Sequence, residues 1–331
     1  MTREFISVTV ASVIEEGGDA RTFTLAAPFT YQPGQFITVR VPSDRPPGSV
    51  ARCYSMSSSP LLGEPPAFTV KRAGYASRWL CDNVAAGTVL DVLPPAGTFT
   101  PATLDGDFLL FAAGSGITPV MSIIKSVLHA GSGRVVLVYA NPDDRSVIFS
   151  SALASLVAAA PSRLVVAHWL DSLLGLPAAA TLAALARPYV AWQTFACGPD
   201  PFLGAVRGAL TLLGASPRQL RVERFVSLAD NPFSMAPDTG GVAATLTVSL
   251  DGSTRVLPWP AGTRMLDVLT GAGLDAPFSC RQGICGACAC QLTSGEVDMV
   301  QNEVLDDTDL ADGYVLACQS LALTPEVSIT Y

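Results

Sequence analysis

Residues 277–288 have the sequence PFSCRQGICGAC, in which Cys280, Cys285 and Cys288 follow the spacing C-x4-C-x2-C. A fourth cysteine, Cys318, lies further along the chain. Small residues between these thiols let a loop wrap tightly, and their backbone N–H groups can point at sulfur. The first residues of the chain are expected to form a strand rather than a secretory signal, and clustered cysteines in a cytosolic protein favour a metal site over disulfides.

Four thiolates with this spacing are typical of a [2Fe–2S] cluster. The alternatives are a zinc site, which usually takes two close cysteine pairs, or plain buried cysteines. Cys290 is not part of the pattern and is expected to pack under the loop as a small apolar residue. The loop resembles that of plant-type ferredoxins. The resemblance covers residues 242–331 and implies a β-grasp fold with Cys280, Cys285, Cys288 and Cys318 as ligands.

Composition limits the possible classes of protein. The chain has 331 residues, of which 49% are apolar and 15% charged, so packed cores are expected and extensive disorder is not. No apolar run is long enough to span a bilayer, which predicts a cytoplasmic protein with no membrane contact. The net charge of −8 arises from residues 241–331, which hold 3 basic and 11 acidic residues. An acidic module of this kind argues against nucleic-acid binding. The charge serves either solubility or the attraction of a protein partner with a basic surface.

The chain before the cysteine loop divides into two patterns. Residues 1–102 contain short alternating segments cut by Gly and Pro, which predict a small antiparallel barrel or sandwich. The strands are expected at residues 5–13, 21–25, 35–41, 66–71 and 89–93. Residues 103–227 alternate continuous apolar runs with helical segments, which predict a buried parallel sheet. Its strands are expected at 108–113, 134–140, 163–169, 191–196 and 220–225, and its helices at 119–130, 150–159, 178–186 and 200–213.

Residues 228–241 have the composition of a linker, with two Pro and two Gly. After it, residues 244–257 predict a hairpin that turns at Asp251-Gly252, and Thr263 is expected to cap a helix ending near residue 271. The expected fold is therefore multidomain. It has an antiparallel barrel (1–102), a parallel-sheet α/β domain (103–227), a linker (228–241) and a β-grasp domain (242–331).

The barrel segment carries the motif Arg52-Cys53-Tyr54-Ser55 at the expected end of a loop, followed by the sequence VKRAGYAS at residues 70–77 and GTF at 97–99. R-x-Y-S alone is also compatible with an ordinary strand and a solvent-facing Arg. Together with the next segment, these motifs resemble the ferredoxin–NADP reductase superfamily over residues 1–227. The resemblance implies that Arg52 pairs with a flavin phosphate, Tyr54 lies on the isoalloxazine face, and Ser55 hydrogen-bonds near flavin N5. It implies further flavin contacts from Lys71, Gly74 and Ser77.

The α/β segment has a small-residue turn between a strand and a helix, Gly114-Ser115-Gly116-Ile117-Thr118-Pro119. Such a turn lets a pyrophosphate approach the helix N-terminus, although as a lone dinucleotide signal this form is weak. In the resembled superfamily the form G-x-G-I-T-P is expected, which implies that Gly114, Gly116, Thr118 and Pro119 bind nicotinamide dinucleotide.

The same resemblance places Cys197-Gly198-Pro199 beside the nicotinamide. It gives Ser55, Cys197, Glu223 and Phe225 catalytic positions, with Phe225 covering the second flavin face. The alternatives are a buried thiol at Cys197 and a core residue at Phe225. After residue 140, Asp143 and Asp144 outnumber the single cation Arg145. This favours NADH, since a 2′-phosphate needs clustered cations.

The order of the domains resembles that of oxygenase reductases of the phthalate dioxygenase reductase type. The amino-acid sequences of the motifs resemble those of reductases of 3-ketosteroid 9α-hydroxylase and phenylacetyl-CoA oxygenase systems. This implies FAD rather than FMN, and a path from NADH through flavin and a [2Fe–2S] cluster to a terminal oxygenase, Rieske-type and acting on aromatic or steroid substrates. The acidic domain is the expected docking site. Alternatives are a redox sensor that changes partner affinity and a diaphorase that reduces small quinones.

Overall fold

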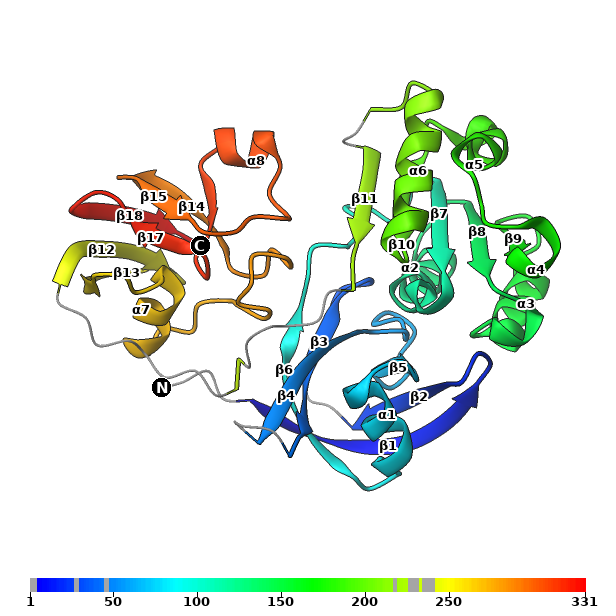
Figure 1. Ribbon diagram of the computed structural model, residues 1–331, viewed down its shortest axis with the longest axis horizontal. Helices are drawn as coiled ribbons and strands as arrows, with labels where there is room; N and C mark the ends of the chain where they lie inside the picture. The colour runs from blue at the N-terminus through cyan, green and yellow to red at the C-terminus, as the bar shows by residue number, and fades with distance from the viewer. Residues whose placement is uncertain (1–4, 27–29, 45–47, 217–218, 226–231, 234–241) are drawn as a thin grey trace.

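The computed structural model describes residues 5–26, 30–44, 48–216, 219–225, 232–233 and 242–331. Over these residues the strands form three larger sheets, which succeed one another along the chain, and a two-stranded ribbon. In Figure 1 the first sheet lies at the bottom, the green parallel sheet at the upper right, and the C-terminal domain at the left. The expected fold class of barrel, parallel-sheet domain and β-grasp domain is confirmed.

The first sheet is antiparallel and curls around its own core. Its order, over the residues described, is β4-β3-β6-β1-β2-β5. Val8 and Val10 point into the core while their neighbours Ser7 and Thr9 do not, because successive side chains of a strand alternate between its faces. The elements are β1 (Ile6–Glu16), β2 (Ala20–Ala26), β3 (Phe36–Pro42), β4 (Ser49–Ser55), β5 (Ala67–Lys71), α1 (Tyr75–Asn83) and β6 (Val89–Ala96).

Two elements of the barrel differ from expectation. The prediction that residues 52–55 end a loop is wrong, because they end strand β4, which pairs with β3 from Ser49 to Ser55. The polar residues of this segment do not form the apolar pattern that predicts a strand. Pairing with β3 stabilises the strand instead. Helix α1 was also unexpected. Its first turn is fixed by the Ser77 hydroxyl, which accepts the Gly74 N–H at 3.0 Å.

The second sheet is parallel, with the order β11-β10-β7-β8-β9 in the described chain. Its central strand β7 buries both faces: Phe108 and Leu110 face α2 and α3, whereas Leu109 and Phe111 face α5 and α6. This explains the continuous apolar run in the sequence. The elements are β7 (Phe108–Ala113), η1 (Gly114–Gly116), α2 (Ile117–Ala130), β8 (Val135–Asn141), η2 (Asp144–Ser146), α3 (Ser150–Ala159), β9 (Leu164–Leu170), α4 (Asp171–Leu174), α5 (Ala179–Ala186), η3 (Arg187–Tyr189), β10 (Gln193–Cys197), α6 (Asp200–Leu212) and β11 (Leu220–Glu223).

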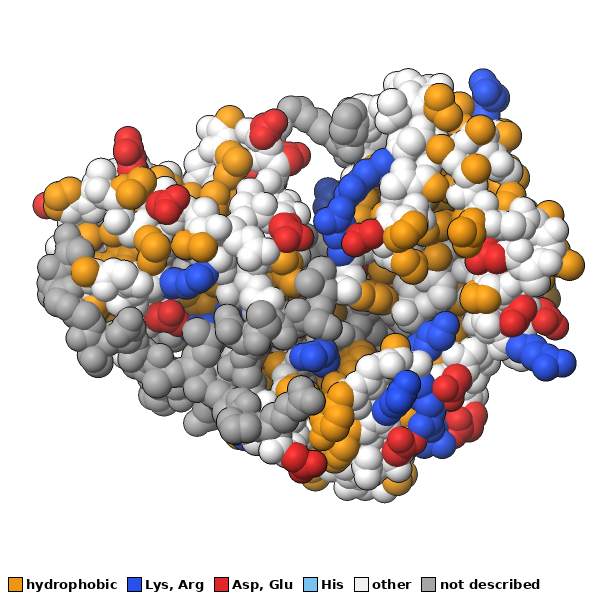
Figure 2. All heavy atoms as spheres, viewed as in Figure 1, with side chains coloured by type: hydrophobic (Ala, Val, Ile, Leu, Met, Phe, Trp, Pro, Cys, Tyr) orange, Lys and Arg blue, Asp and Glu red, His pale blue; other side chains and the backbone are white. Residues whose placement is uncertain are grey.

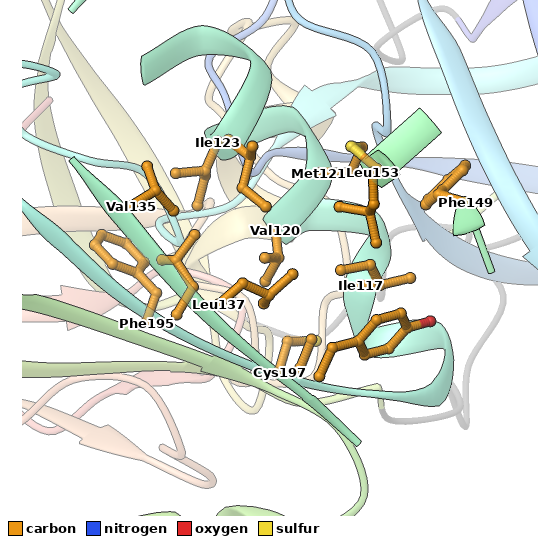
Figure 3. Close-up of a cluster of buried hydrophobic side chains, with 14 of the residues drawn as sticks. Ile117, Val120, Met121, Ile123, Val135, Leu137, Phe149, Leu153, Phe195 and Cys197 are labelled. Carbon is orange, nitrogen blue, oxygen red and sulfur yellow. The ribbon is translucent and has the colours of Figure 1, made fainter. Parts of the chain in front are cut away.

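Figure 3 shows how one face of this sheet is covered. Val120 and Ile123 of α2 lie over Leu137 of β8 and Phe195 of β10. All four side chains are at most 1% exposed. Complete burial of aliphatic and aromatic groups on this scale stabilises the domain by roughly 1.5–3 kcal/mol per side chain. Helix α2 is thereby fixed at the carboxyl end of β7, where its first turn borders the candidate site.

The C-terminal sheet has the order β13-β12-β18-β14-β16 in the described residues, with β12 and β18 parallel. The predicted hairpin is confirmed, and its turn residues Asp251 and Gly252 have φ of 50° and 74°. Asp-Gly suits this left-handed turn because Gly has no Cβ to clash. The elements are β12 (Val242–Leu250), β13 (Ser253–Pro260), α7 (Met265–Gly271), β14 (Ala289–Ser294), β15 (Val297–Met299), α8 (Asp307–Ala311), β16 (Tyr314–Leu316), β17 (Ser320–Ala322) and β18 (Glu326–Thr330).

The expected cap of α7 is wrong. The helix begins after Arg264 without a side-chain cap, and the carbonyl of Thr263 accepts the Trp259 indole N–H at 2.7 Å. Trp259 is 1% exposed, so this buried N–H needs an acceptor. The requirements of the core have therefore decided the conformation of this turn.

The expected linker, residues 228–241, lies outside the described residues apart from 232–233. The ring of Phe233 lies 6.4 Å from that of Phe5, at the first barrel strand. The expected domain boundaries stay predictions, although the strands of the three sheets fall on the expected sides of them. In the part of the chain that the structure describes, no helix is both long and apolar enough to cross a membrane.

Candidate functional site

A cavity of about 310 Å³ lies where the barrel, the parallel-sheet domain and the cysteine loop meet. Most of the site residues expected from the sequence line it, although they come from distant parts of the chain. They are Arg52, Tyr54, Ser55, Lys71, Gly74, Ser77, Thr118, Glu223, Phe225, Cys280 and Cys285. Six expected residues around the dinucleotide turn, and two cysteines, do not line it. They are Gly114, Gly116, Pro119, Cys197, Gly198, Pro199, Cys288 and Cys318.

The barrel wall of the cavity is cationic and has room for a ligand. Arg52 at β4 and Lys71 at the end of β5 supply the positive charges. A Cβ added at Gly74 would meet no atom within 4 Å, so the start of α1 opens into free space. Cations beside the N–H groups of a helix start are suited to a phosphate. This wall therefore fits the phosphate end of a flavin.

The inner part of the same wall is aromatic and less polar. Tyr54 lies with its ring 5.7 Å from that of Phe68, and burial raises its pKa. Ser55 is 3% exposed and lines the cavity beside it. A half-buried phenol next to a buried hydroxyl can stack on a planar ring system and hydrogen-bond to its edge. The donor set fits an isoalloxazine.

Two turns predicted separately meet at the carboxyl ends of β7 and β10. A Cβ at Gly116 would lie 2.1 Å from the carbonyl oxygen of Cys197, and a Cβ at Gly198 would lie 2.9 Å from Cβ of Ala113. Glycine is therefore required at both positions, because any side chain would collide with the other turn. The Thr118 hydroxyl donates to the Ser115 carbonyl at 3.0 Å and fixes the first turn of α2.

The thiol of Cys197 belongs to the core beneath these turns. It is 0% exposed and belongs to the buried cluster drawn in Figure 3, which also contains Ile117 of α2. Burial raises its pKa well above the ordinary value, so the group is a neutral thiol. Its catalytic role stays a prediction, since the thiol does not line the cavity.

In the cysteine loop the four expected thiols contact one another. Cys280 interacts with Cys285 and with Cys318, and Cys318 also interacts with Cys288. Hydrogen bonds from the first two neighbours lower the pKa of Cys280. Among the residues described, no three such side chains gather as ligands of one metal ion would. The interactions form one chain, Cys285–Cys280–Cys318–Cys288, so the four thiols lie close enough together to ligate a compact iron–sulfur cluster.

Backbone and amide donors surround these sulfurs. The N–H of Gln282 points at Cys280 Sγ at 3.3 Å, and the N–H of Cys318 at Cys288 Sγ at 3.4 Å. The loop bends through Gly283 and Gly286, with φ of 72° and 68°, so both turns need glycine. Cys290 is 1% exposed in the core below, so its expected packing as a small apolar residue is confirmed.

Sequence reasoning missed the residues that support the loop. Asp267 of α7 forms an ion pair with Arg281, whose own φ is 59°. The Gln319 amide donates to Arg281 O at 2.8 Å and to Cys318 Sγ at 3.4 Å, and Arg264 donates to Cys318 O at 2.9 Å. No sequence signal indicates these contacts, because the partners are brought together only by folding.

Glu223 is the acid of the site, and its side chain is half-buried. It ends β11, opposite Cys197 in the strand register, and lines the cavity. Burial, and then the negative charge of Cys280, raise its pKa to about 8. This carboxyl therefore keeps its proton at neutral pH. Phe225, two residues later, is 49% exposed and also lines the cavity.

A second, wider groove of about 890 Å³ lies between the α6–β11 side of the parallel-sheet domain and the C-terminal domain. Arg207, Arg221 and Arg224 line one side, and acidic residues around α8 line the other. Figure 2 shows this notch, with blue side chains on one wall and red ones across it. Arg224 and Glu303 approach across it to 3.9 Å. Cys285 lines this groove as well as the cavity, so the cysteine loop borders both.

Comparison with protein families identifies two of the three domains. Residues 110–207 match the oxidoreductase NAD-binding domain, and residues 248–323 match the 2Fe-2S iron-sulfur cluster binding domain. Among solved structures, phthalate dioxygenase reductase has 24% identity and a TM-score of 0.58, with 99% of this chain and 98% of that chain covered. An intact type IV self-sufficient cytochrome P450 monooxygenase has 24% identity and a TM-score of 0.65, with 98% and 40% covered. Both share the fold.

Curated relatives match over the full length. The ferredoxin reductase component of 3-ketosteroid-9-alpha-monooxygenase is 48% identical in Rhodococcus rhodochrous, with 98% of this chain and 97% of the relative covered. The protein of the same name in Mycobacterium tuberculosis is 51% identical, with 98% and 96% covered. The reductase subunit of glycine betaine monooxygenase from Pseudomonas aeruginosa is 30% identical, with 95% and 92% covered. The chain therefore belongs to the family of ferredoxin reductase components of monooxygenases, oxidoreductases with an NAD-binding domain and a [2Fe–2S] domain.

Proposed function

We propose that the 310 Å³ cavity binds FAD and that the protein transfers electrons from NADH to a steroid-hydroxylating terminal oxygenase. The observation that carries the proposal is the convergence on one cavity of the barrel motifs, the end of the parallel-sheet domain and the cysteine loop. A flavin bound there accepts a hydride and releases electrons singly, which matches a two-electron donor to a one-electron cluster. The residues below hold it and exclude water.

The flavin is held in two parts. Arg52 and Lys71 pair with its phosphates, beside the open start of α1 at Gly74 and Ser77. Tyr54 and Phe225 line the cavity and would lie against the ring system, and the buried Ser55 hydroxyl would hydrogen-bond at its hydride-accepting edge. Phe225 is half exposed, so it can yield its place to the nicotinamide. Glu223 lines the same cavity and would hold a proton there, because burial raises its pKa to about 8.

The dinucleotide binds across the paired turns of β7 and β10. Gly114, Gly116, Thr118 and Pro119 receive the pyrophosphate at the start of α2, where Gly114 is only partly buried and a Cβ added to it would meet no atom closer than 3.9 Å. Cys197, Gly198 and Pro199 form the opposite turn and place the nicotinamide toward the cavity. These roles rest on the resemblance and on the contact between the two turns.

The preference for NADH is supported at the neighbouring strand ends. Asp143 is partly engaged in its own turn, because its Oδ1 accepts the N–H and the hydroxyl of Ser146 at 2.9 and 2.7 Å. Asp171 follows β9, and its buried Oδ1 has no hydrogen-bond partner among the described residues. A carboxylate in this region suits a free ribose diol better than a 2′-phosphate. Arg145 remains the single cation of the segment after β8.

Four cysteines, Cys280, Cys285, Cys288 and Cys318, ligate the [2Fe–2S] cluster. Identity of 48% and 51% to reductase components of 3-ketosteroid-9-alpha-monooxygenase supports a steroid-hydroxylating acceptor. A Rieske centre in that acceptor follows only from the resemblance to oxygenase reductases. Acidic residues around α8 give the oxygenase a complementary surface if its own docking face is basic. The protein acts in the cytoplasm.

The experiment is an anaerobic NADH titration of the purified protein followed by visible absorbance. Flavin and cluster bands that bleach together, at about three electrons per chain, support the complete path, since flavin takes two and the cluster one. A flavin that NADH does not bleach contradicts the proposal and favours the redox sensor. Bleaching of the flavin alone, with fast turnover of small quinones, favours the diaphorase. Oxygenase is then added to the reduced protein. Reoxidation of the cluster would show that the oxygenase accepts its electrons.

A further inference from the structure

The barrel presents a row of three residues to the C-terminal domain. Leu93 of β6, Thr38 of β3 and Cys53 of β4 stand opposite one another in the strand register. Opposed residues of neighbouring strands share one face of a sheet. Leu93 is 2% exposed and packs into the core of the C-terminal domain, so this face of the barrel is the one that the cysteine loop contacts.

A buried hydroxyl pair joins this row to the loop. Thr38 Oγ1 lies 2.7 Å from Ser279 Oγ and 3.4 Å from Cys53 Sγ. Thr38 is 0% exposed and Ser279, which precedes the ligand Cys280, is 1% exposed. Their hydrogen bond therefore ties the loop to the barrel immediately next to a cluster ligand.

The surroundings of this hydrogen bond are apolar. Ala51 and Cys280 are buried against each other, with Cys53, Ile284 and Cys285 packed around them. A hydrogen bond in such a dry contact is hard to replace, because removing one partner leaves the other buried and unsatisfied. The contact therefore favours one position of the loop over others.

The row adjoins the flavin cavity. Cys53 stands between Arg52 and Tyr54 in the motif assigned to the flavin, and it lines the cavity together with Cys280 and Cys285. One strand thus supplies both the residues that hold the flavin and a residue on which the cysteine loop rests. The cavity proposed for the flavin is therefore lined by two of the cluster ligands as well as by a residue of this row.

We propose that Leu93, Thr38 and Cys53 form the seat of the cysteine loop, and that the Thr38–Ser279 hydrogen bond is a positioning contact for electron transfer from flavin to cluster. The inference rests on the proposed function and deepens it. One electron crosses the seat in each transfer, which oxidises the flavin site by one electron and reduces the cluster by one, with no bond made or broken. The seat acts by fixing the distance that this electron crosses.

The first test separates the two redox steps by anaerobic rapid mixing with NADH. Thr38→Val removes the hydroxyl at almost constant shape, and Thr38→Ser keeps it. We expect Thr38→Val to slow cluster reduction about tenfold while the NADH bleaching step stays unchanged, since small displacements of a reacting group cost rate steeply. Thr38→Ser should restore the rate. Cluster reduction in Thr38→Val at the wild-type rate would overturn the inference.

A double-variant comparison tests the bond itself. Ser279→Ala should slow cluster reduction as much as Thr38→Val, and the double variant no more than either, because all three lack the same hydrogen bond. Losses that add would show that the two hydroxyls act separately, which contradicts a shared contact. Thr22→Val is the matched control, because Thr22 bonds Thr69 in the same barrel at 2.7 Å and Thr22 does not belong to the seat. It should leave both steps unchanged.

The second readout is structural and needs no turnover. Cys53 is partly buried and packs beneath the loop, against Ala51 and Cys280. In the oxidised holoprotein we expect alkylation of Cys53, followed by peptide mapping, to be several times faster in Thr38→Val than in wild type or Thr22→Val. Equal labelling rates would show that the loop stays seated without the bond, against the inference. If wild-type flavin is not bleached by NADH, the proposed function fails instead, so the two failures are distinct.

Discussion

Single residues of the site are shaped by burial more than by their own chemistry. Partial or complete burial raises the pKa of the Cys197 thiol, the Glu223 carboxyl and the Tyr54 phenol, so each of the three groups is neutral at pH 7. Arg52 differs, since its charge faces a cavity whose described barrel residues include no carboxylate. A cation in such a place indicates an anionic ligand.

Arg52 is therefore expected to decide flavin retention. Arg52→Ala should weaken flavin binding by about 2 kcal/mol, or roughly 30-fold, because it removes a charged hydrogen-bond donor from a phosphate. Fluorescence titration of the flavin-free protein measures this. The control is Arg40→Ala on the adjacent strand, which loses a 3.6 Å ion pair with Asp91 but lines no part of the cavity. Equal affinity in Arg52→Ala and wild type would remove its phosphate role.

Glu223 predicts a pH dependence of stability. Its pKa is raised from 4.5 to about 8, so the folded protein keeps a proton that the unfolded chain releases. The free energy of unfolding should fall as pH rises from about 4.5 to about 8 and then level off. Glu223→Gln should reduce this slope, measured by thermal unfolding at several pH values. The exposed Glu296→Gln serves as control, and an unchanged slope in Glu223→Gln would contradict the assignment.

At the scale of elements, turns between strands and helices carry the chemistry while the strands position them. The turns after β7 and β10 touch so closely that Gly116 and Gly198 have no substitute. Helix α8 is different, because it is short and its residues are polar. The Asp306 carboxylate accepts the N–H groups of Thr308 and Asp309 at 2.8 and 3.0 Å, so part of the acidic cluster serves to build the helix.

The remaining acids of α8 are expected to steer the oxygenase. Asp307→Asn with Asp312→Asn leaves the cap intact, and should lower the rate of oxygenase reduction roughly tenfold at low ionic strength and weaken its dependence on salt. Asp251→Asn, at the β12–β13 turn, removes a charge elsewhere on the domain and is the control. NADH oxidation with ferricyanide should be equal in all variants. A salt dependence as steep as that of wild type in the double variant would exclude steering by α8.

The whole molecule is arranged around the meeting point of its three sheets. Barrel residues form one wall of the cavity, the end of β11 a second, and the cysteine loop a third. Cys285 also borders the outer groove, so the loop connects the flavin site with the surface. The proposed electron path, from NADH through flavin to the cluster, does not follow the order of the domains along the chain, because the packing of the three sheets brings the cysteine loop to the barrel.

Cys285→Ser tests this arrangement. The variant should still take a hydride from NADH, since the barrel and the parallel-sheet domain are intact, but should lose reduction of cytochrome c and of the oxygenase. Cys290→Ala is the matched control, because that thiol is 1% exposed in the core and is no part of the ligand set. Visible spectra and both reductase rates should separate the two variants. Full cytochrome c reduction by Cys285→Ser would mean that electrons leave by another route.

The amino-acid sequence by itself determined the local features of this protein. Continuous apolar runs predicted the parallel strands, because both faces of that sheet are buried. Asp251-Gly252 predicted a hairpin turn, because its backbone needs a left-handed conformation. The cysteine spacing predicted four thiols in contact, because three of them lie on one tight loop. The family resemblance added flavin and nicotinamide residues that periodicity alone does not indicate.

Only the tertiary structure decided which of these features meet. It placed Arg52 to Ser55 in a strand, since pairing with β3 supplies the stability that the segment's own pattern lacks. Thr263, which the sequence predicts to cap a helix, instead accepts a buried indole N–H with its carbonyl oxygen. The tertiary structure also brought Thr38 to Ser279, 241 positions apart in the chain. Such contacts depend on how separate cores pack together, and no local pattern in the sequence encodes that packing.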